Sequence, residues 1–500
     1  MNVKVLQNAD HSSSVPKITL PFQQQYIREI NCKHKPRLEL NLSSKSISST
    51  KTPRSSLLNH SSTPKVDIFK TINQKPTLKI FPFKSLIKPI SIKPIDRTEI
   101  LKFPISSIEI LTLCPEVEDW VKTELENYTE VHYFSKVSKY KPKDFDDDKG
   151  DYKIVFGDDI HYRYEILDIL GKGSFGQVIK VQDHLRKKPI ALKIIKSRQR
   201  YTEQARIEIE LLKLFRNIDV ENKYNIVHLE DDFVFRGHVM ITFELLGLNL
   251  YELLKRNSFR GLSVGLVKRF SYNVLQSLAL LAKNYVIHCD LKPENVLLSD
   301  TNLMSVKLID FGSSCYINQR VYTYIQSRFY RAPEVVLGIP YTSAIDIWSF
   351  GCILVELYTG IPIFPAKNEK ELINFIVEVL GMPPVSLIIQ GTRSQIFFSD
   401  PSEKVNLLES NLKKAPGSRT IRSILKGADE NFIQMIEGCI QWEPKCRITA
   451  INALKSPWFI ENVETASKTT TRRCKISIED ITKHTPQLQK FIAGRANTMK

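Results

Sequence analysis

The stretch VIHCDLKPENVLLSDTNLMSVKLIDFG, residues 286–312, decides the fold of this chain. It contains Asp290 and Asn295 in the spacing D-x-x-x-x-N, and Asp310 then opens the triplet DFG. Short β-prone runs separate these groups, so we expect two neighbouring loops to bring their oxygen atoms together. Asp290 suits the base that phosphoryl transfer requires for an incoming hydroxyl, while Asn295 and Asp310 suit ligands of Mg²⁺. Any one of them alone would indicate only a turn, but the ordered set favours a catalytic site.

Composition limits the class of protein. The 500 residues are 42% hydrophobic and 25% charged, which is enough for one large or two medium domains with tails. No apolar run approaches the roughly 18 residues that a membrane-spanning helix needs, and the start lacks an apolar signal segment. We therefore expect an intracellular protein, cytoplasmic or nuclear, without a transmembrane segment. The eight cysteines form no C-x-x-C pair, so we expect reduced thiols rather than a zinc site or disulfides.

The net charge of +17 is confined to the two ends of the chain. Residues 1–100 hold 17 Lys and Arg against 6 Asp and Glu, and residues 466–500 hold 8 against 2. The part between them is neutral, with 46 side chains of each sign. This distribution predicts that the basic tails contact acidic partners, membrane surfaces or nucleic acid, and argues against a nucleic-acid-binding core. Solvated tails without a partner are the alternative.

The character of the sequence changes along the chain at three points. Residues 1–105 are rich in Ser, Thr, Pro and Lys, which predicts a disordered basic tail. Residues 106–156 combine an amphipathic helical stretch with the acidic run DFDDDKGDYKIV, which predicts a small accessory element. Residues 157–463 form the main domain, and residues 464–500 return to basic tail composition.

Residues 164–183, YEILDILGKGSFGQVIKVQD, read as strand, turn and strand around the motif G-x-G-x-x-G. Glycines allow a hairpin to close over phosphates with its amides pointing at oxygen. Dinucleotide-binding folds use a similar spacing, but there a helix follows the motif, whereas here a second strand follows. The pattern around the loop therefore favours binding of ATP over binding of a dinucleotide. Its candidate ATP-binding residues are Gly171, Lys172, Gly173, Ser174, Phe175, Gly176 and Val178.

The third strand, PIALKIIK, places Lys193 after Ala191 in an apolar setting, where its ammonium can meet the phosphates of ATP. We expect Glu208, on the following helix, to pair with Lys193; Glu203 and Glu210 are the alternatives. The pattern places Ile207, Leu211 and Leu214 on the apolar face of that helix.

A later strand runs into an extended hinge, VMITFELLGLNL. Phe243 is expected to bound the back of the nucleotide pocket, and Glu244 to Leu246 to offer backbone groups to adenine. Leu297, after the catalytic stretch, completes the predicted ATP-binding set.

The second half of the main domain reads as helical. Residues 343–360, SAIDIWSFGCILVELYTG, are apolar nearly all round and predict a central buried helix. Asp346 in its first turn is expected to cap the backbone of the catalytic loop. Arg447 is expected to form a buried pair with Glu334.

Together these motifs resemble those of eukaryotic protein kinases, in their usual order, over residues 164–460. The resemblance implies an α+β bilobal fold, with a β-rich small lobe, an α-helical large lobe and disordered tails. It also implies that Asp290, Lys292 and Asn295 are catalytic and that Asn295 and Asp310 hold Mg²⁺. MgATP and protein substrates are the implied ligands.

Two departures narrow the resemblance. The usual His-Arg-Asp reads His288-Cys289-Asp290, and the activation segment reads VYTYIQSRFYRAPEVVLG. This combination is similar to the dual-specificity tyrosine-regulated (DYRK) kinases of the CMGC group. The acidic run resembles the homology box of that family, which implies packing against the small lobe, and residues 111–134 resemble the accessory element of its class 2 members. Residues 380–398 resemble the family insert.

The resemblance implies transfer of phosphate to Ser or Thr of proteins, preferentially before Pro, by a monomer. It further implies that Tyr324 is autophosphorylated once, within the molecule, and that Arg328 and Arg331 then clamp the phosphate. Tyr322 is not expected to be essential. The alternatives are another CMGC kinase, such as the homeodomain-interacting type, or a scaffold or pseudokinase acting through its tails. Cys289 and Cys315 are expected near the active centre as reduced thiols, with oxidative coupling as the alternative.

Overall fold

The computed structural model describes residues 102–135, 144–299, 305–320, 323–400, 402, 405–410 and 412–460. The chain divides into two compact units, Met1–Lys102 and Phe103–Lys500, and all elements described below belong to the second. The predicted tails fall almost wholly outside the described residues, as does Tyr322. None of the helices in the described ranges combines the length and apolar character needed to cross a lipid bilayer.

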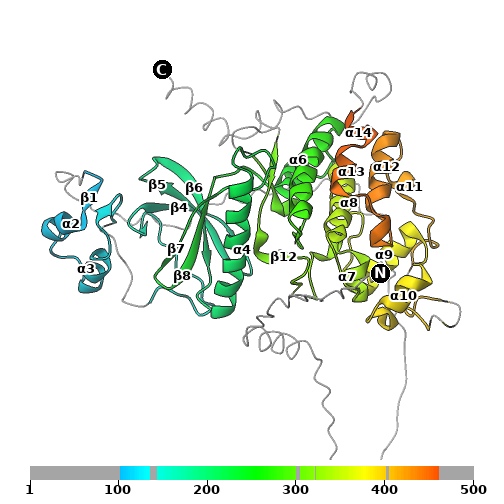
Figure 1. The fold of residues 1–500 in the computed structure, drawn as a ribbon, viewed down its shortest axis with the longest axis horizontal. Coiled ribbons are helices and arrows are strands. Elements are labelled where there is room, and N and C mark those ends of the chain that lie inside the picture. The colour runs from blue at the N-terminus through cyan, green and yellow to red at the C-terminus, as the bar shows by residue number, and fades with distance from the viewer. Residues whose placement is uncertain are drawn as a thin grey trace, which may run out of the picture. The chain divides into compact units, whose positions relative to one another are not determined.

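An antiparallel six-stranded sheet forms the small lobe, in the order β3-β4-β5-β6-β8-β7 (Figure 1). The glycine-rich turn joins β4 to β5, as the strand–turn–strand pattern of residues 164–183 predicts. The register sets Val178 opposite Lys193 and Ala191 opposite Phe243, so the predicted nucleotide-binding side chains share neighbouring strands. The strands are β3 (Asp159–Ile160), β4 (Tyr164–Lys172), β5 (Gly176–Asp183), β6 (Lys188–Ile195), β7 (Leu229–Phe235) and β8 (His238–Phe243).

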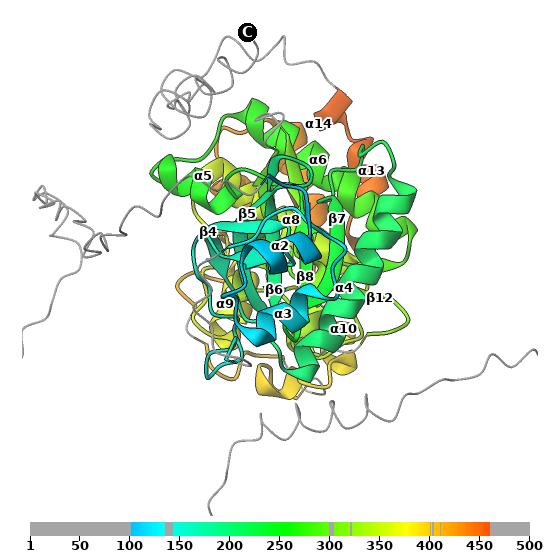
Figure 2. The same cartoon turned by 90° about the vertical axis from the view of Figure 1, so that its left-hand side faces the viewer.

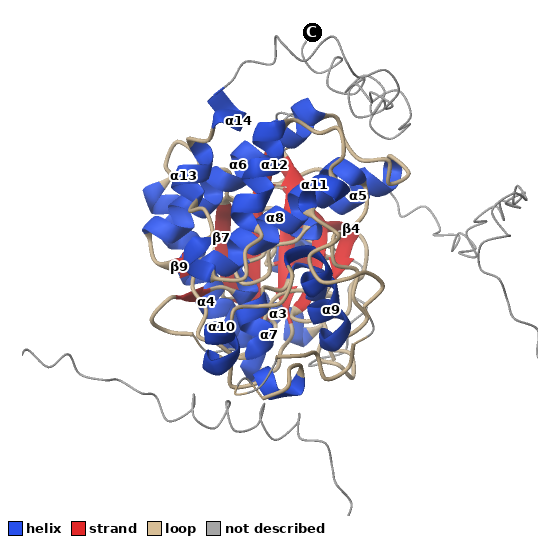
Figure 3. Ribbon diagram, turned by 90° about the vertical axis from the view of Figure 1, so that its right-hand side faces the viewer, coloured by secondary structure: helices blue, strands red, loops and turns tan. Residues whose placement is uncertain are grey.

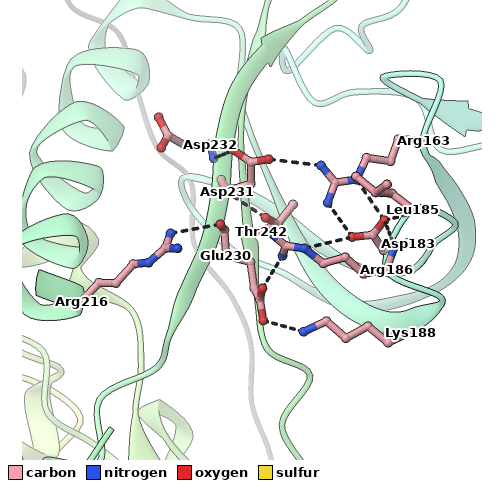
Figure 4. A network of polar contacts seen from close by, with 10 residues as sticks. All are labelled: Arg163, Asp183, Leu185, Arg186, Lys188, Arg216, Glu230, Asp231, Asp232 and Thr242. Carbon is pink, nitrogen blue, oxygen red and sulfur yellow. Dashed lines mark hydrogen bonds and ion pairs between the residues drawn. The ribbon is translucent and has the colours of Figure 1, made fainter. Parts of the chain in front are cut away.

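A charged network holds the end of the sheet opposite the glycine-rich turn (Figure 4). The Arg163 guanidinium donates to the carboxylate of Asp183 at 2.7 and 2.9 Å, and Asp183 is fully buried. Lys188 Nζ donates to Glu230 Oε1 at 2.8 Å and so ties β6 to β7. The β5–β6 turn is thereby fixed by interactions that do not involve the catalytic residues.

Helix α4 (Gln199–Ile218) packs against the sheet and against the short turn η2 (Phe311–Ser313). Because α4 packs against both the sheet and η2, a wider part of its circumference is buried than the predicted apolar face includes. Ile207 and Leu214 are only half-buried. The buried side chains are Gln204, Ala205, Glu208, Ile209, Leu211, Leu212 and Phe215.

The accessory element consists of α2 (Ser107–Leu113), α3 (Asp119–Leu125) and a two-stranded ribbon, β1 (Ile105–Ser106) with β2 (Glu130–Val131). A reciprocal capping box of Ser106 and Glu109 begins α2. The helices lie in front of the small-lobe sheet in Figure 2. Arg236, in the β7–β8 turn, ion-pairs with Glu124 on α3 at 2.9 Å, which joins the element to the sheet. The element begins at or before Ile105, slightly earlier than the predicted residue 106.

The rest of the domain is mainly helical (Figure 3), as predicted. Helix α8 is buried along almost its whole length and packs against α6 and α12. The helices are α5 (Leu250–Arg256), α6 (Val264–Lys283), α7 (Pro333–Leu337), α8 (Ala344–Thr359), α9 (Glu369–Leu380), α10 (Val385–Gln390), α11 (Ile421–Ile424), α12 (Glu430–Cys439), α13 (Ala450–Leu454) and α14 (Pro457–Ile460). Short turns of 3₁₀ helix are η1 (Pro293–Asn295), η2, η3 (Arg328–Tyr330), η4 (Ser394–Ile396) and η5 (Pro444–Cys446).

A buried ion pair fastens Arg447, which directly follows η5, to Glu334 in α7. Arg447 Nη1 and Nη2 donate to the two carboxylate oxygens of Glu334, both at 2.7 Å, and both side chains are fully buried. The predicted pairing is present. Removal of one partner of such a pair typically costs about 3–5 kcal/mol, because the other charge is left buried alone.

Candidate active site

The catalytic stretch folds into two small ribbons. β9 (Val286–Ile287) pairs with β12 (Cys315–Tyr316), and β10 (Val296–Leu298) pairs with β11 (Val306–Leu308). The loop between β9 and β10 is held from below by Asp346, whose carboxylate accepts from the backbone amides of His288 at 2.8 Å and Cys289 at 3.1 Å. Because these amides belong to the loop that carries Asp290, Asp346 fixes the direction of the candidate base. This is the capping predicted from its position in α8.

Asp290 is surrounded by donors. Lys292 Nζ donates to Asp290 Oδ2 at 2.6 Å, and Ser327 donates to Oδ1 through its hydroxyl at 2.9 Å and its amide at 3.1 Å. Asn295 Nδ2 donates to the backbone oxygen of Asp290 at 2.9 Å. Asp290 itself is only 18% exposed. The carboxylate therefore accepts hydrogen bonds from the Lys292 ammonium on one oxygen and from Ser327 of the activation segment on the other, which fix its orientation.

A charge triad joins Lys193 of β6 and Glu208 of α4 to Asp310 of the DFG triplet. Lys193 Nζ lies 2.7 Å from Glu208 Oε1 and 3.0 Å from Asp310 Oδ1. Burial opposes the charge of Lys193, but the two carboxylates overcome it and raise the pKa of the ammonium. Burial likewise opposes ionisation of Asp310, and Lys193 overcomes it and holds the pKa of that carboxyl below its usual value. The alternatives to Glu208, Glu203 and Glu210, do not make this pair.

The backbone conformation of the DFG triplet directs the Asp310 carboxylate toward Lys193. Asp310 has φ 64°, in the left-handed region that Asp tolerates better than most residues. Phe311 is fully buried between Phe215 of α4 and His288, with ring centroids 5.5 and 5.2 Å away. A Cβ on Gly312 would lie 3.2 Å from Asp310 Oδ1, so glycine leaves room for the carboxylate.

The glycine-rich turn has space where a nucleotide would lie. A Cβ on Gly176 would approach the Ile194 carbonyl oxygen to 2.0 Å, so strand pairing requires glycine there. A Cβ on Gly171 would meet no described atom within 4 Å, so packing does not explain that glycine. Glycine therefore leaves this side of the turn open to close approach by a ligand.

The predicted adenine contact lies in the hinge after β8 and stays a prediction. Phe243 is 9% exposed, and the side chain of Glu244 is turned to Lys307, 2.5 Å away. Among the described residues, no protein hydrogen bond uses the backbone groups of Leu246. Leu297 lies in β10, where it pairs with Lys307 of β11 and forms an isolated bridge with Asn249.

The donor set suits Mg²⁺ bound together with phosphates. Within the described ranges, no group of three or more His, Cys, Asp or Glu side chains is placed to hold a metal alone. Asp310 offers a carboxylate, and Asn295 keeps its Oδ1 as an acceptor because its Nδ2 is used by Asp290. Mg²⁺ typically takes one or two protein oxygens and completes its shell with phosphates and water, which this pair fits.

The activation segment brings Tyr324 to both predicted arginines. The guanidinium carbon of Arg331 lies 3.9 Å from the Tyr324 ring centroid. Partial burial opposes ionisation of Tyr324, but hydrogen bonding to Arg331 and then to Arg328 holds the pKa of the phenol below its usual value. Tyr324 remains 59% exposed. The ring is therefore accessible and already lies in a positive environment.

Two residues near Tyr324 and Asp290 escaped the sequence analysis. Glu369, at the start of α9, accepts from Arg331 Nη1 at 2.9 Å and from Arg393 Nη2 at 2.6 Å. Ser327 joins the activation segment to Asp290, as described above. Both contacts connect segments far apart in sequence. Only the position of Ser327 in the quoted activation motif gave a signal, and Glu369 gave none.

Two thiols lie behind the catalytic loop, as expected. The Sγ atoms of Cys289 and Cys315 are 3.8 Å apart, and both side chains are buried. Both residues are free cysteines in the structure.

Comparison with known proteins agrees with this geometry. The family model described as "Protein kinase domain" matches residues 164–459. The human dual specificity tyrosine-phosphorylation-regulated kinase 4 is 50% identical over 322 residues, covering 64% of this chain and 62% of the relative. Kinase 2 of the same name from Drosophila melanogaster is 44% identical over 366 residues, covering 71% of this chain and 50% of the relative.

A fission yeast relative, serine/threonine-protein kinase ppk5, is 45% identical over 349 residues, covering 67% of this chain and 42% of the relative. The chain thus matches only about half of the length of these relatives. The predicted bilobal fold and the predicted family are confirmed, whereas these relatives lend no support to a homeodomain-interacting kinase or a scaffold. The chain belongs to the protein kinase family and, within it, to the DYRK kinases of the CMGC group.

Proposed function

We propose that this chain is a dual-specificity protein kinase, which transfers the γ-phosphoryl group of ATP to Ser or Thr of proteins after autophosphorylation on Tyr324. The observation that carries the proposal is the position of Asp290. Its carboxylate accepts from Lys292 and Ser327, while Lys193 and Glu208 of the small lobe form a charge triad with Asp310 of the DFG triplet. A base, a phosphate-binding cation and a metal-binding carboxylate are the groups that phosphoryl transfer needs.

Each residue has a separate role in this mechanism. Asp290 Oδ accepts the hydrogen bond of the substrate hydroxyl and takes its proton as the phosphorus–oxygen bond forms. Lys292, already bonded to Asp290, is placed to contact the transferring phosphoryl oxygens. Lys193, held by Glu208, binds the α- and β-phosphates. Asp310 and Asn295 would hold Mg²⁺, which when bound neutralises charge on the phosphates.

The nucleotide is bound between the glycine-rich turn and the ribbon that carries Leu297. Val178 and Ala191 contact one face of adenine in this proposal, and Leu297 contacts the other. The free backbone groups at Leu246 supply the hydrogen bonds to the adenine edge. Phe243, at the back of the pocket, leaves little space behind the base.

Phosphorylation of Tyr324 completes the substrate platform. A phosphotyrosine adds nearly two negative charges and three acceptors, and Arg328 and Arg331 are already beside the ring. Clamping of the phosphate would order the segment that carries Ser327 and hence the orientation of Asp290. We further propose that substrates have Pro after the target residue, that the chain acts as a monomer inside the cell, that it is a class 2 member and that its basic tails contact acidic partners.

The test is a phosphate-transfer assay with purified protein, radiolabelled ATP, Mg²⁺ and a basic peptide containing one Ser-Pro site. Transfer that requires Mg²⁺ and Asp290 is expected. A protein that binds ATP but transfers no phosphate to any peptide or to itself would contradict the proposal. Comparison with a Ser-Ala peptide tests the preference for Pro.

A further inference from the structure

The acidic turn, residues 144–152, is built as a rigid unit. Asp147 Oδ1 accepts from the amides of Lys149 at 2.8 Å and Asp151 at 2.9 Å, and its own amide donates to the Asp151 carbonyl. These bonds fix the backbone of the turn and the direction of the Asp147 carboxylate. Such a turn presents two negative charges on a stiff backbone rather than on a mobile loop.

The acidic turn is fastened to the small-lobe sheet. His238 Nε2 lies 2.7 Å from Asp146 Oδ1, and His238 is fully buried in β8. The side chain of Ser197 also donates to Asp146, and the Ser197 amide donates to the Gly150 carbonyl at 3.1 Å. The turn is therefore anchored at the ends of β6 and β8, close to the glycine-rich turn.

A second anchor connects the acidic turn to the accessory element. Arg236 Nη1 donates to the Tyr152 hydroxyl at 3.0 Å, and the same guanidinium binds Glu124 of α3. It also lies over the rings of Trp120 and Phe145, 5.3 and 4.9 Å from their centroids. Accessory element, acidic turn and sheet thus share one buried cation.

Lys172 is the contact between this rigid unit and the glycine-rich turn. Its Nζ lies 2.9 Å from Asp151 Oδ2 and 3.7 Å from Asp147 Oδ2. Asp151 is 2% exposed, so one end of the pair is shielded from solvent while Lys172 is half exposed. Lys172 stands between Gly171 and Gly173 of the glycine-rich turn, and the Gly173 amide closes that turn by donating to the Gly176 carbonyl at 2.8 Å. An ion pair at this place links the glycine-rich turn to the acidic turn.

We propose that Lys172 is a positioning residue, which ties the glycine-rich turn to the acidic turn and so increases nucleotide affinity. The inference rests on the proposed ATP binding. The rival reading is that the Lys172 ammonium leaves the acidic turn and contacts phosphate itself. The two readings differ in what removal of Asp151 does, because only a positioning lysine depends on that carboxylate.

The experiment measures the dissociation constant of a fluorescent ADP analogue with Mg²⁺ for the full chain and its variants. Lys172→Gln is expected to weaken binding about threefold, within the range for a pair that is partly exposed. Asp151→Asn is expected to weaken it by a similar factor, and the double variant no further. Lys172→Arg, which keeps the pair, should restore most of the affinity. Melting curves confirm that each variant is folded.

The matched control is Lys188→Gln. Lys188 forms an ion pair of 2.8 Å with Glu230, with a similarly exposed lysine, at the other end of β5 from the glycine-rich turn. It should leave nucleotide affinity unchanged. Amide hydrogen exchange at residues 173–176 without nucleotide gives an independent readout, and should rise in Lys172→Gln but not in the control.

The outcomes separate the two proposals. A wild-type protein that fails to bind the nucleotide would contradict the proposed function, whereas equal exchange at residues 173–176 in wild type and Lys172→Gln would overturn only the positioning role. Full affinity in Asp151→Asn together with a loss in Lys172→Gln would overturn it too, in favour of direct phosphate contact.

Discussion

The catalytic cleft and the activation segment differ in how completely their charges are paired. In the cleft, Lys193 is shared by Glu208 and Asp310, and Asp290 is bonded to Lys292 and Ser327. Around Tyr324, by contrast, positive charge exceeds negative. The Arg328 Nε atom is buried and has no hydrogen-bond partner among the described residues. The side chains of the cleft are therefore already paired and oriented, whereas the segment around Tyr324 has an excess of positive charge that an anion would neutralise.

The largest expected effect comes from a change in the catalytic cleft, where the charges are paired. Asp290→Asn should reduce phosphate transfer by about a thousandfold or more, because the amide cannot accept the proton, and general bases contribute roughly 10²–10⁴ to rate. Radiolabel transfer to peptide measures the loss. The variant should melt within a few degrees of the wild type, since Asn can keep the contact with Ser327. Substantial activity in this variant would contradict the role of Asp290.

The arrangement of the candidate catalytic residues was predictable from the sequence, because local spacing and pairing of β10 with β11 place Asp290, Asn295 and Asp310 in neighbouring loops. The Lys193–Glu208 pair required only a strand and the next helix. The bond between Ser327 and Asp290 was not predictable, because it depends on how the activation segment returns to the loop. The same is true of Glu369, whose role is set by packing of α9 against η3.

The second prediction concerns the activation segment, where positive charge exceeds negative charge. Tyr324→Phe should lower peptide phosphorylation by about tenfold, because the phenylalanine cannot carry the phosphate that Arg328 and Arg331 would bind. Nucleotide affinity should be unchanged, since the cleft is already paired. Steady-state kinetics of dephosphorylated wild type provide the control, which should resemble the variant. Wild-type rates in Tyr324→Phe would show that the segment needs no anion.

A third prediction separates the two arginines. Arg328→Gln should remove about 1–2 kcal/mol of the stabilisation that phosphorylation of Tyr324 gives, because charge-assisted hydrogen bonds contribute roughly 1.5–3 kcal/mol. The unphosphorylated protein should lose little, since Arg328 has few partners there. Urea unfolding of both forms measures the difference. An equal loss in both forms would mean that Arg328 is structural.

The smallest effect concerns pH. Tyr330 of the activation segment donates to buried Glu356 on α8 at 2.7 Å, and burial raises the pKa of Glu356 to about 7. This folded-state value lies above the value of an unfolded glutamate, so the native state holds an extra proton between roughly pH 4.5 and 7. The free energy of unfolding should therefore decrease as pH rises through that window.

Glu356→Gln tests this dependence. The amide can still accept from Tyr330 but does not titrate, so the variant should flatten the pH dependence of the free energy of unfolding across the window. Glu294, which is exposed and adds to the pKa shift, is the nearby acidic neighbour, and Glu294→Gln serves as the control with a smaller effect. An unchanged slope in Glu356→Gln would place the proton elsewhere.

We propose that the catalytic cleft phosphorylates Tyr324 of its own chain. Mass spectrometry of the intact protein and its peptides, after expression in bacteria, tests it most directly. We expect one phosphate on Tyr324 in the wild type and none in Asp290→Asn. Fully active wild-type protein without phosphate on Tyr324, or phosphate on Tyr324 in the Asp290→Asn protein, would contradict it.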